Sequence, residues 1–260
     1  DYLEQAGWNE PPTTWEEVRQ CAKDVTEKVE GVYGLGFGFG KCPDTENNGR
    51  SALFSLGGHI FDEEGNLSLT APETVEALQW ISDMYLVDGS IPPTAVNWDD
   101  AGNNTAFLSG QVAMIFNAAS LTMELQKEEN AEFAANVGVA DMPAGPSGTL
   151  ICNGPQYLSI FNNAKNPELA KELIEFNMDY DWYKGWVDEM KYGVQPAYED
   201  IVYDDPYITP YIHSNENSVW QGYPGPYTGI AAQAWSAFKL TDVFQRILVD
   251  QIPVEQAAAE

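Results

Sequence analysis

The sequence predicts an α/β fold, because short segments with strand periodicity alternate along the chain with amphipathic helical segments. Residues 14–28 begin with a capping box and continue with apolar residues at helical spacing, which is typical of a helix that packs on a core. Residues 112–116 alternate apolar with smaller side chains, as in a strand buried on one face. The chain has 260 residues, of which 44% are hydrophobic, so it can bury a sizeable core in one or two domains.

The first half of the chain carries the clearest local signals. In residues 32–39 glycines alternate with larger apolar side chains, which predicts a buried strand whose glycines let another backbone come close. Residues 41–50 combine proline, asparagine and glycine and are interpreted as a polar loop. A hairpin turn is expected at 62–66, and a helix with proline in its first turn is expected from 72 to about 88.

The second half alternates helical and extended patterns in the same way. A short helix is expected between Asp99 and Gly110, with carboxylates at its start and glycine at its end. The remaining predicted elements are strands over 136–140 and 156–161 and helices over 168–178, from 205 onward, and from about 230 to 249.

The chain is strongly acidic, with 40 Asp and Glu against 12 Lys and Arg and a formal net charge of −28. Such a surface repels phosphate backbones and anionic lipid headgroups, so binding of nucleic acid or of a membrane surface is disfavoured. The same field argues against a strongly anionic ligand. No apolar stretch of about 18 residues could insert into a bilayer, and no basic, apolar signal segment opens the sequence. The charge is typical of a soluble protein in a secreted or salt-rich setting.

The three cysteines and two histidines do not indicate a metal or redox site. Cys21, Cys42 and Cys152 fit neither a zinc spacing nor a C-x-x-C pair. Cys21 falls in a helical pattern and is expected to be buried. For Cys42 and Cys152, which lie near the ends of predicted strands, a disulfide and separate thiols are both open. His59 and His213 have no partner at helical spacing, so no metal ligand, cofactor or catalytic residue is assigned.

A set of motifs spread over nearly the whole chain carries a family resemblance. Residues 99–117, DDAGNNTAFLSGQVAMIFN, are similar to the "AF..G..AM..NG" core of the family 1 extracellular solute-binding proteins, which are the maltose-binding-protein-like receptors of ABC importers. Further segments resemble the family in the family's order: PPTTWEEV at 11–18, LGGHIFDEEGNLSL at 56–69, PETVEALQWISDMY at 72–85, VGVADMPAGP at 137–146 and NPELAKELIEF at 166–176.

The resemblance implies a periplasmic binding protein of type II, mainly its C-terminal lobe with part of the N-terminal lobe. Residues 1–158 and 205–260 would form lobe 2, and residues 159–204 would cross the hinge and supply the return helices of lobe 1. The first part of lobe 1 would be absent from this sequence, together with any export signal or lipid-anchor cysteine. The return helix would then expose an apolar face.

Candidate ligand contacts follow from residue chemistry together with this resemblance. Asn117 ends a predicted strand, at the edge where open α/β sheets bind ligands, and Ser120 follows it where the family often has an aromatic residue. Asn153 and Gln156 fall where the family commonly has Gly-Gly-Trp-Gly, so an amide stands in place of an aromatic ring. Asn117 could instead satisfy backbone groups at the strand end.

The remaining candidates are loop residues suited to bind a sugar. The polar residues expected on the loop at 41–50 are Asp44, Glu46, Asn47 and Arg50. The stacking candidates are Tyr223 and Tyr227, in the loop that carries a sugar-stacking aromatic in relatives, and Trp98. The alternatives are that Asp44 and Glu46 are solvated charges and that the loop aromatics pack over the domain. Three tryptophans on helical patterns are interpreted as core: Trp182, Trp186 and Trp235.

The function expected from the resemblance is that of a non-catalytic receptor. It would bind a neutral mono- or oligosaccharide between two closing lobes and deliver it to the permease of an ABC importer. The receptor would be monomeric and periplasmic or extracellular, with a lipid anchor as a further option. A glycoside hydrolase and a carbohydrate-binding domain without a role in transport remain alternatives, although no G-x-S-x-G, H-E-x-x-H or P-loop motif occurs.

Overall fold

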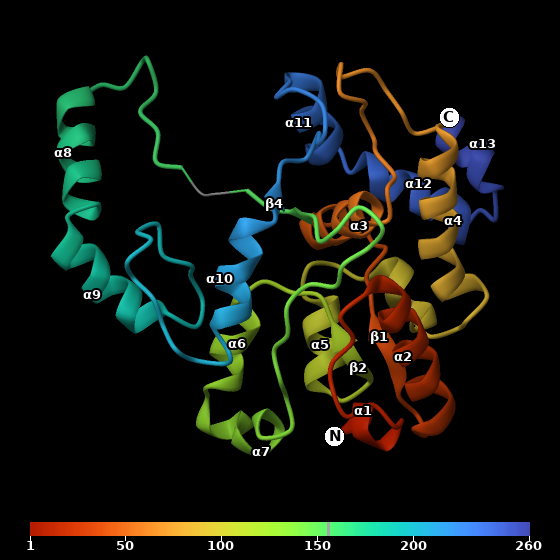
Figure 1. Ribbon diagram of the computed structural model, residues 1–260. Helices are drawn as coiled ribbons and strands as arrows, with labels where there is room; N and C mark the ends of the chain where they lie inside the picture. Colours follow the sequence, from red (N-terminus) through yellow and green to blue (C-terminus); the bar gives the residue numbers. More distant parts are fainter. Residues whose placement is uncertain (155–156) are drawn as a thin grey trace.

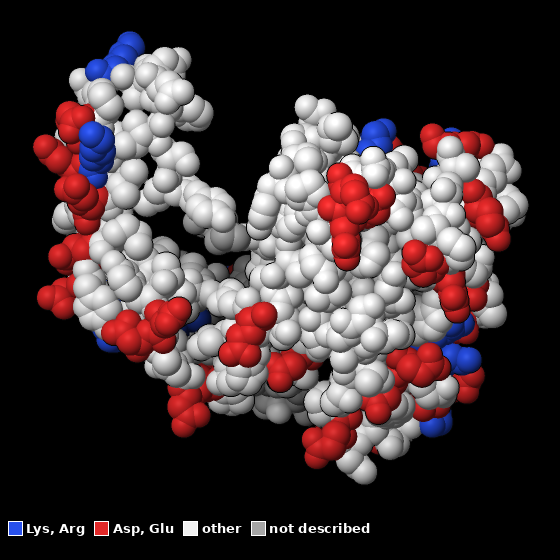
Figure 2. Space-filling model, turned by 45° about the horizontal axis from the view of Figure 1, so that its top comes forward, with Lys and Arg blue, Asp and Glu red and all other residues white. Residues whose placement is uncertain are grey.

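The computed structural model describes residues 1–154 and 157–260, and it has two parts of unequal size (Figure 1). The larger part, the body, holds both chain ends. The smaller part, which we call the arm (residues 159–204), stands to one side and is joined to the body by extended segments. A hollow separates the two parts on the face seen in Figure 2.

Two parallel strands form the first sheet of the body and position the site. β1 (Tyr33–Gly36) pairs with β2 (Val112–Ile115). Because the strands are parallel, their carboxyl ends meet at the same edge of the sheet. The strands predicted at 32–39 and 112–116 are confirmed, although each is shorter than its apolar pattern.

Helix α2 (Trp15–Lys28) packs on this sheet and contains the predicted capping box. The Thr14 hydroxyl oxygen accepts the backbone N–H of Glu17 at 3.2 Å, and the Glu17 carboxylate accepts that of Thr14 at 3.2 Å. Gly34 lets the helix and strand approach closely, since a Cβ at this position would lie 2.0 Å from the carbonyl oxygen of Ala22. The expectation that glycine admits another backbone is therefore confirmed at Gly34, whereas a Cβ at Gly36 would first meet the side chains of Ile115 and Val112.

Residues 41–50, interpreted from the sequence as a loop, are mostly helical, so that prediction is wrong. Helix α3 (Pro43–Ser55) has proline in its first turn, where the missing N–H costs nothing, and carboxylates near the positive end of its dipole. Its inner side is buried, and a Cβ at Gly49 would lie only 3.1 Å from α12 (Lys239–Leu248). Tertiary packing overrides weak intrinsic helix propensity here.

Two other helices of the first half, α4 (Pro72–Leu86) and α5 (Gly102–Leu108), are those expected at 72–88 and between Asp99 and Gly110. The elements without a counterpart among the predictions are α1 (Tyr2–Gln5), α6 (Ser120–Leu125), α7 (Ala131–Ala134) and the 3-10 turns Pro93–Asn97 and Glu128–Asn130. The Asp62 carboxylate accepts the backbone N–H of Asn66 at 2.8 Å in the predicted turn. The strand predicted over 136–140 is wrong. There the hydroxyl of Tyr207 binds the Val137 carbonyl at 3.0 Å, and no strand partner is present among the described residues.

The second half contributes a second parallel pair and the C-terminal helices. The elements are β3 (Ile151–Cys152), α8 (Pro167–Asn177), α9 (Tyr180–Met190), α10 (Thr209–Glu216), β4 (Ser218–Val219), α11 (Gly229–Ser236), α12 and α13 (Val254–Ala259). The single helix predicted over 230–249 is two helices, because Phe238 adopts a left-handed backbone with φ of 55°. Residues 157–161 are not a strand, and Gln156 lies outside the described residues.

The main core lies in the body, where aromatic side chains from several elements meet. Phe39 packs against Phe37 and Phe244, with ring centroids 5.3 Å apart in both pairs. Trp15 is 1% exposed and packs against Phe116 with ring centroids 4.8 Å apart. None of the helices in residues 1–154 and 157–260 is long and apolar enough to cross a membrane.

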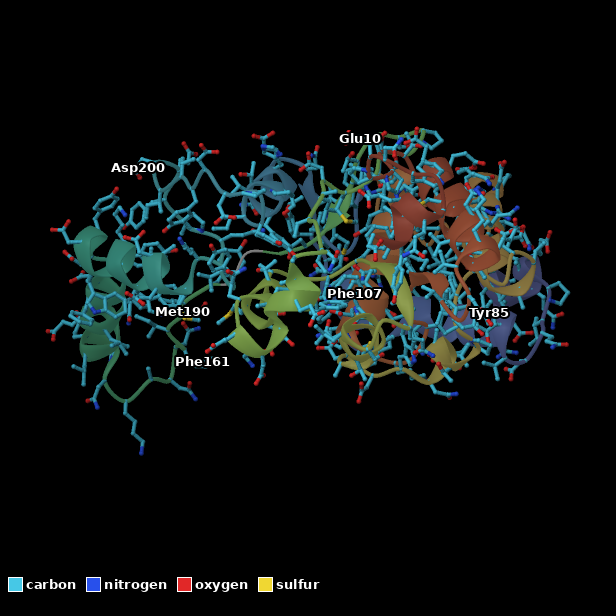
Figure 3. The ribbon with its side chains drawn as sticks, turned by 90° about the horizontal axis from the view of Figure 1, so that it is seen from below. Glu10, Tyr85, Phe107, Phe161, Met190 and Asp200 are labelled. Carbon is cyan, nitrogen blue, oxygen red and sulfur yellow. The ribbon has the colours of Figure 1, made fainter. Side chains whose placement is uncertain are left out.

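The arm has a small cluster of its own and an exposed apolar face. Tyr183, Val187 and Ile201 are buried together between α9 and the segment that returns to the body. On α8, by contrast, Leu173 is 59% exposed and Phe176 is 56% exposed. The apolar stripe expected on this helix is present and is largely solvent-exposed. In Figure 2 the carboxylates of the arm lie along its outer edge, and Figure 3 shows the arm, marked by Met190, well apart from the body around Tyr85.

All three cysteines are buried free thiols in the structure. Burial raises the pKa of Cys21 and the pKa of Cys152 to about 12 each. Since the thiolate is the reactive form, we expect iodoacetamide at neutral pH to leave both residues unmodified in the folded protein and to alkylate them after denaturation. Peptide mass spectrometry checks this. Rapid alkylation of Cys152 without denaturation would show that its surroundings open easily.

Candidate functional site

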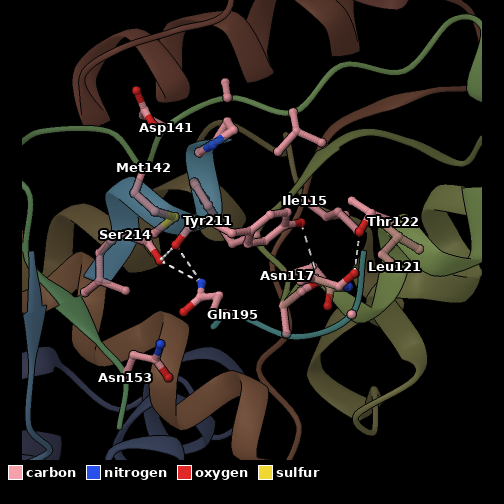
Figure 4. A pocket seen from close by; sticks show the side chains of 18 of the residues that line it. Ile115, Asn117, Leu121, Thr122, Asp141, Met142, Asn153, Gln195, Tyr211 and Ser214 are labelled. Carbon is pink, nitrogen blue, oxygen red and sulfur yellow. Dashed lines mark hydrogen bonds between the residues drawn. The ribbon is translucent and has the colours of Figure 1, made fainter. Parts of the chain in front are cut away.

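A cleft of about 1,990 Å³ lies between the body and the arm. On the body side it is lined by the whole of β2 with the residues that follow it, by the polar face of α3, by residues at the ends of β3 and by residues near the N-terminus. On the other side it is lined by α9, the return segment near Gln195 and α10 (Figure 4). Parallel strands therefore direct their carboxyl ends into this space, as open α/β sheets do at ligand sites.

Side-chain amides hold the end of β2 in place. The Phe116 carbonyl accepts hydrogen bonds from the amide of Asn48 at 3.2 Å and from that of Asn103 at 3.3 Å. The next residue, Asn117, lines the cleft and donates through its amide to the side-chain oxygen of Asn104. The strand end thus presents a polar rim to the cleft.

Asp44, in the first turn of α3, lines the cleft close to this rim. Its carboxylate accepts the Asn103 amide at 3.2 Å, and its backbone N–H donates to the Asp100 carboxylate at 3.3 Å. Burial and the negative charge of Asp100 raise the pKa of Asp44, although the hydrogen bond from Asn103 acts in the opposite direction. The group is a hydrogen-bond acceptor that is only partly screened by water.

Aromatic rings form the facing wall of the cleft. Trp182 and Trp186 of α9 line it and are 40% and 42% exposed, so their interpretation as core residues is wrong. Tyr211 projects from α10 across the middle of the view in Figure 4. Burial raises its pKa to about 12, which keeps the phenol neutral. Gln195 donates to the Tyr211 carbonyl at 2.6 Å and so ties the return segment to α10.

The charged side chains of the lining all have the same sign. They are the carboxylates of Asp1, Glu4, Glu10, Asp44 and Asp141. Within residues 1–154 and 157–260 the lining includes no Lys, Arg or His. A bound anion would therefore meet carboxylates without a countercharge, and binding would be unfavourable. Over the same residues, no group of three His, Cys, Asp or Glu side chains is arranged to hold a metal ion.

Four of the candidates chosen from the sequence come together in the cleft. Asp44 and Asn47 reach it from α3, Asn117 from the end of β2 and Asn153 from the end of β3. Asn47 is held from behind, because its side-chain oxygen accepts the indole N–H of Trp235 at 2.8 Å. Ser120 begins α6 and is not part of the lining, and Gln156 lies outside the described residues.

Glu46 and Arg50 lie behind the cleft and are fully buried. Arg50 donates to Glu46 through two nitrogens, at 3.2 and 2.7 Å, and to the Gln221 carbonyl at 2.9 Å. The other carboxylate oxygen of Glu46 accepts the backbone N–H and the hydroxyl of Thr241 at 2.8 and 2.9 Å. The pair therefore joins α3 to α12, and both charges are used within the protein.

The three aromatic candidates also lie outside the cleft lining. Trp98 donates its indole N–H to the Thr94 hydroxyl at 3.2 Å. Tyr223 packs against Phe54, with ring centroids 5.8 Å apart. Tyr227 is 84% exposed and stacks on Trp220 at 4.4 Å. The aromatic wall comes instead from α9 and α10, and no sequence pattern indicates that these helices lie near the cleft.

The fold and the site together define a class of protein. Parallel strands end at an amide-lined cleft, and an arm bearing aromatic rings faces them across it, as expected for a two-lobed ligand-binding protein. The family model for bacterial extracellular solute-binding proteins matches residues 1–184. The chain belongs to this family. The resemblance found in the sequence motifs is thereby confirmed.

Individual relatives agree with this assignment. A putative binding protein of Brucella abortus is 31% identical over 186 residues, which cover 70% of this chain and 43% of that protein. A probable ABC transporter-binding protein of Deinococcus radiodurans is 27% identical over 209 residues, which cover 78% of this chain and 47% of that protein. The chain thus spans about half the length of the curated relatives that it matches.

Solved structures confirm the type II periplasmic binding protein fold. Maltose-bound MalE3 of T. maritima superposes with a TM-score of 0.78 at 22% identity, and the match covers 100% of this chain and 66% of the MalE3 chain. A sugar transporter protein of Arthrobacter chlorophenolicus with bound laminaribiose has a TM-score of 0.81 at 18% identity, with coverage of 99% and 65%. A solute-binding protein of Agrobacterium radiobacter with ribitol has a TM-score of 0.77 at 20% identity, with coverage of 100% and 65%.

Proposed function

We propose that this protein is a solute receptor, which binds a neutral sugar or polyol in the cleft and delivers it chemically unchanged to an ABC importer. The observation that carries this proposal is the composition of the cleft wall. Amides and one partly buried carboxylate on the body face aromatic rings on the arm, and Lys, Arg and His are absent from the described lining.

This combination suits a polyhydroxylated molecule without charge. Amide groups both donate to and accept from hydroxyls, whereas a carboxylate accepts from them. Aromatic rings cover the C–H faces of a sugar and exclude water from the contact. Asn117 and Asp44 would supply the first kind of contact, and Trp186 the second. An anionic ligand would find no cationic side chain in the described lining of the cleft.

The relatives support the same class of ligand. The solved structures above hold maltose, laminaribiose and ribitol, all of which are uncharged and rich in hydroxyls. The family name places these proteins outside the cytoplasm. We infer that residues 159–204 belong to one lobe and the rest of the chain to the other, that the lobes close on the ligand, and that the receptor acts as a monomer that presents its closed form to a permease.

A binding panel tests the proposal. We expect maltose, laminaribiose, ribitol or D-mannitol to raise the melting temperature saturably and to be recovered intact, while glucose 6-phosphate has no effect. Sugar hydrolysis in the same samples would favour a glycoside hydrolase. Stabilisation by the phosphorylated sugar alone would contradict the assignment to neutral ligands.

Asn117→Ala should weaken the affinity for the bound sugar about tenfold, which corresponds to about 1.4 kcal/mol, because one hydrogen-bonding group is lost from the cleft. Tyr227→Ala is the matched control, since its ring is exposed and outside the cleft. Isothermal titration calorimetry measures both. Loss of affinity in the Tyr227 variant, with normal binding in the Asn117 variant, would place the ligand elsewhere.

A further inference from the structure

Asn103 stands directly behind the polar rim of the cleft and is 5% exposed. It is not one of the residues that line the cleft. Its amide nitrogen donates to two acceptors, the Asp44 carboxylate at 3.2 Å and the Phe116 carbonyl at 3.3 Å. Its side-chain oxygen accepts the backbone N–H of Asn104 at 2.8 Å. Every hydrogen-bonding atom of this nearly buried amide is therefore used.

These partners define the orientation of the Asn103 amide. If the nitrogen and oxygen were exchanged, the oxygen would face the Asp44 carboxylate and the Phe116 carbonyl, which are both acceptors. The exchanged form would also present a donor to the backbone N–H of Asn104. The observed orientation is the one in which each contact pairs a donor with an acceptor.

The surroundings of Asp44 make this donation important. Burial raises the pKa of Asp44, and Asp100, an exposed carboxylate on the loop before α5, raises it further through its negative charge. The Asn103 amide of α5 lowers that pKa by donating a hydrogen bond. The Phe116 carbonyl at the end of β2 does not titrate. The other carboxylates of the cleft lining are Asp1, Glu4, Glu10 and Asp141.

We propose that Asn103 is a positioning residue, which holds the Asp44 carboxylate as a hydrogen-bond acceptor facing the cleft and thereby determines how sugar binding depends on pH. This inference rests on the proposed function. A ligand hydroxyl donates to ionised Asp44, and protonation of the carboxylate removes that acceptor. Affinity should therefore decrease as the pH falls through the Asp44 pKa. Because the hydrogen bond from Asn103 lowers that pKa, the loss of affinity is confined to lower pH.

The first test needs no ligand. The side-chain carboxyl of Asp44 is followed by carbon-detected NMR between about pH 3 and about pH 8, and its signal is assigned from its loss in Asp44→Asn. In Asn103→Ala the midpoint should move to higher pH. In Asp100→Asn, which changes an exposed side chain, it should move to lower pH. Asn48→Ala is the matched control, because it removes the other donor to Phe116 without touching Asp44, and its midpoint should not move.

Asn103→Asp provides a second variant of the same size in case the alanine variant is poorly folded. A carboxylate at this position places like charge beside Asp44 and should shift the upper midpoint of the coupled pair to higher pH, because the second proton leaves against the charge of the first ionised group. An Asp44 midpoint that is unchanged in both folded variants would overturn the inference.

The second test follows affinity for maltose, laminaribiose and D-mannitol over the same pH range. The acidic loss of affinity should begin at higher pH in Asn103→Ala, at lower pH in Asp100→Asn, and should disappear in Asp44→Asn. Asn48→Ala can weaken binding at every pH but should not shift the profile. A merely structural role of Asn103 would lower affinity by the same factor at every pH, which would overturn the inference.

The two tests separate the two proposals. If none of maltose, laminaribiose, ribitol and D-mannitol binds the unmodified protein but the Asp44 midpoint still moves as expected in the apo variants, the neutral-sugar assignment fails while the role of Asn103 in setting the charge of Asp44 stands. If the probes bind with a pH profile that Asn103→Ala leaves unchanged, the receptor assignment stands and the role of Asn103 fails.

Discussion

Glu46→Ala should lower the free energy of unfolding by about 3–5 kcal/mol, the cost of leaving a buried charge without its partner. Arg50 would keep one bond, to the Gln221 carbonyl, and would lose both bonds to Glu46 in a site with no access to water. The backbone N–H and the hydroxyl of Thr241 would also lose their acceptor. Urea denaturation followed by circular dichroism measures the change.

An exposed ion pair with similar spacing provides the control. Glu168 and Lys171 lie 2.8 Å apart on α8, with side chains 78% and 56% exposed. Glu168→Ala should change the free energy of unfolding by no more than about 0.5 kcal/mol, since solvent screens such pairs. If the two variants lost similar stability, the buried pair would not be the link between α3 and α12 that its contacts indicate.

Gly34→Ala should also destabilise the protein, by about 1–3 kcal/mol or more. The added methyl group would overlap the backbone of Ala22, with its carbon 2.0 Å from the carbonyl oxygen and 2.2 Å from the Cα. A backbone atom cannot rotate away as a side chain can, so α2 or β1 must move. The expected result is a lower melting temperature, measured by differential scanning calorimetry.

Gly185→Ala is the matched control for this substitution. Gly185 lies inside helix α9 and has no atom within 4 Å of the position that a Cβ would take. Alanine is the better helix former, so this variant should be as stable as the parent protein or slightly more stable. An unchanged melting temperature for Gly34→Ala would mean that α2 and β1 have room for the added methyl group and are not in close contact.

Local patterns in the sequence were sufficient to predict α2 and β1. The capping box at Thr14 acts through neighbours three residues away, and the glycine alternation at 32–39 is a pattern typical of a closely packed strand even though its partners, Ala22 and β2, lie elsewhere in the chain. Helix α3 could not be recognised in this way. Its sequence favours a loop, and what makes it helical is burial against α12, almost 200 residues later in the chain. The same limit applies to the break at Phe238, since a left-handed backbone without glycine leaves no local signal.

The candidate site was predicted in part, for the same reason. Asn117 follows a strand that the sequence pattern predicts, and strand ends in open α/β sheets are where ligands bind, so this position could be chosen from the residues. Asn153 was chosen from the resemblance of residues 153–156 to a family segment, and the structure places it directly after β3. Glu46 was wrongly assigned to the ligand site, because residues 41–50 were expected to form a loop. In the structure it lies on the buried side of α3. Tyr211 and Trp186 were missed because only the return of the chain brings α10 and α9 opposite β2.

The distribution of the indole rings has a spectroscopic consequence. Trp182 and Trp186 line the cleft and are partly exposed to water, whereas Trp15 is buried in the body. If the proposed ligand binds in this cleft, we expect it to displace that water and to change the emission of Trp182 and Trp186, while the emission of Trp15 stays the same. Binding could then be followed by the protein's own fluorescence without an added label.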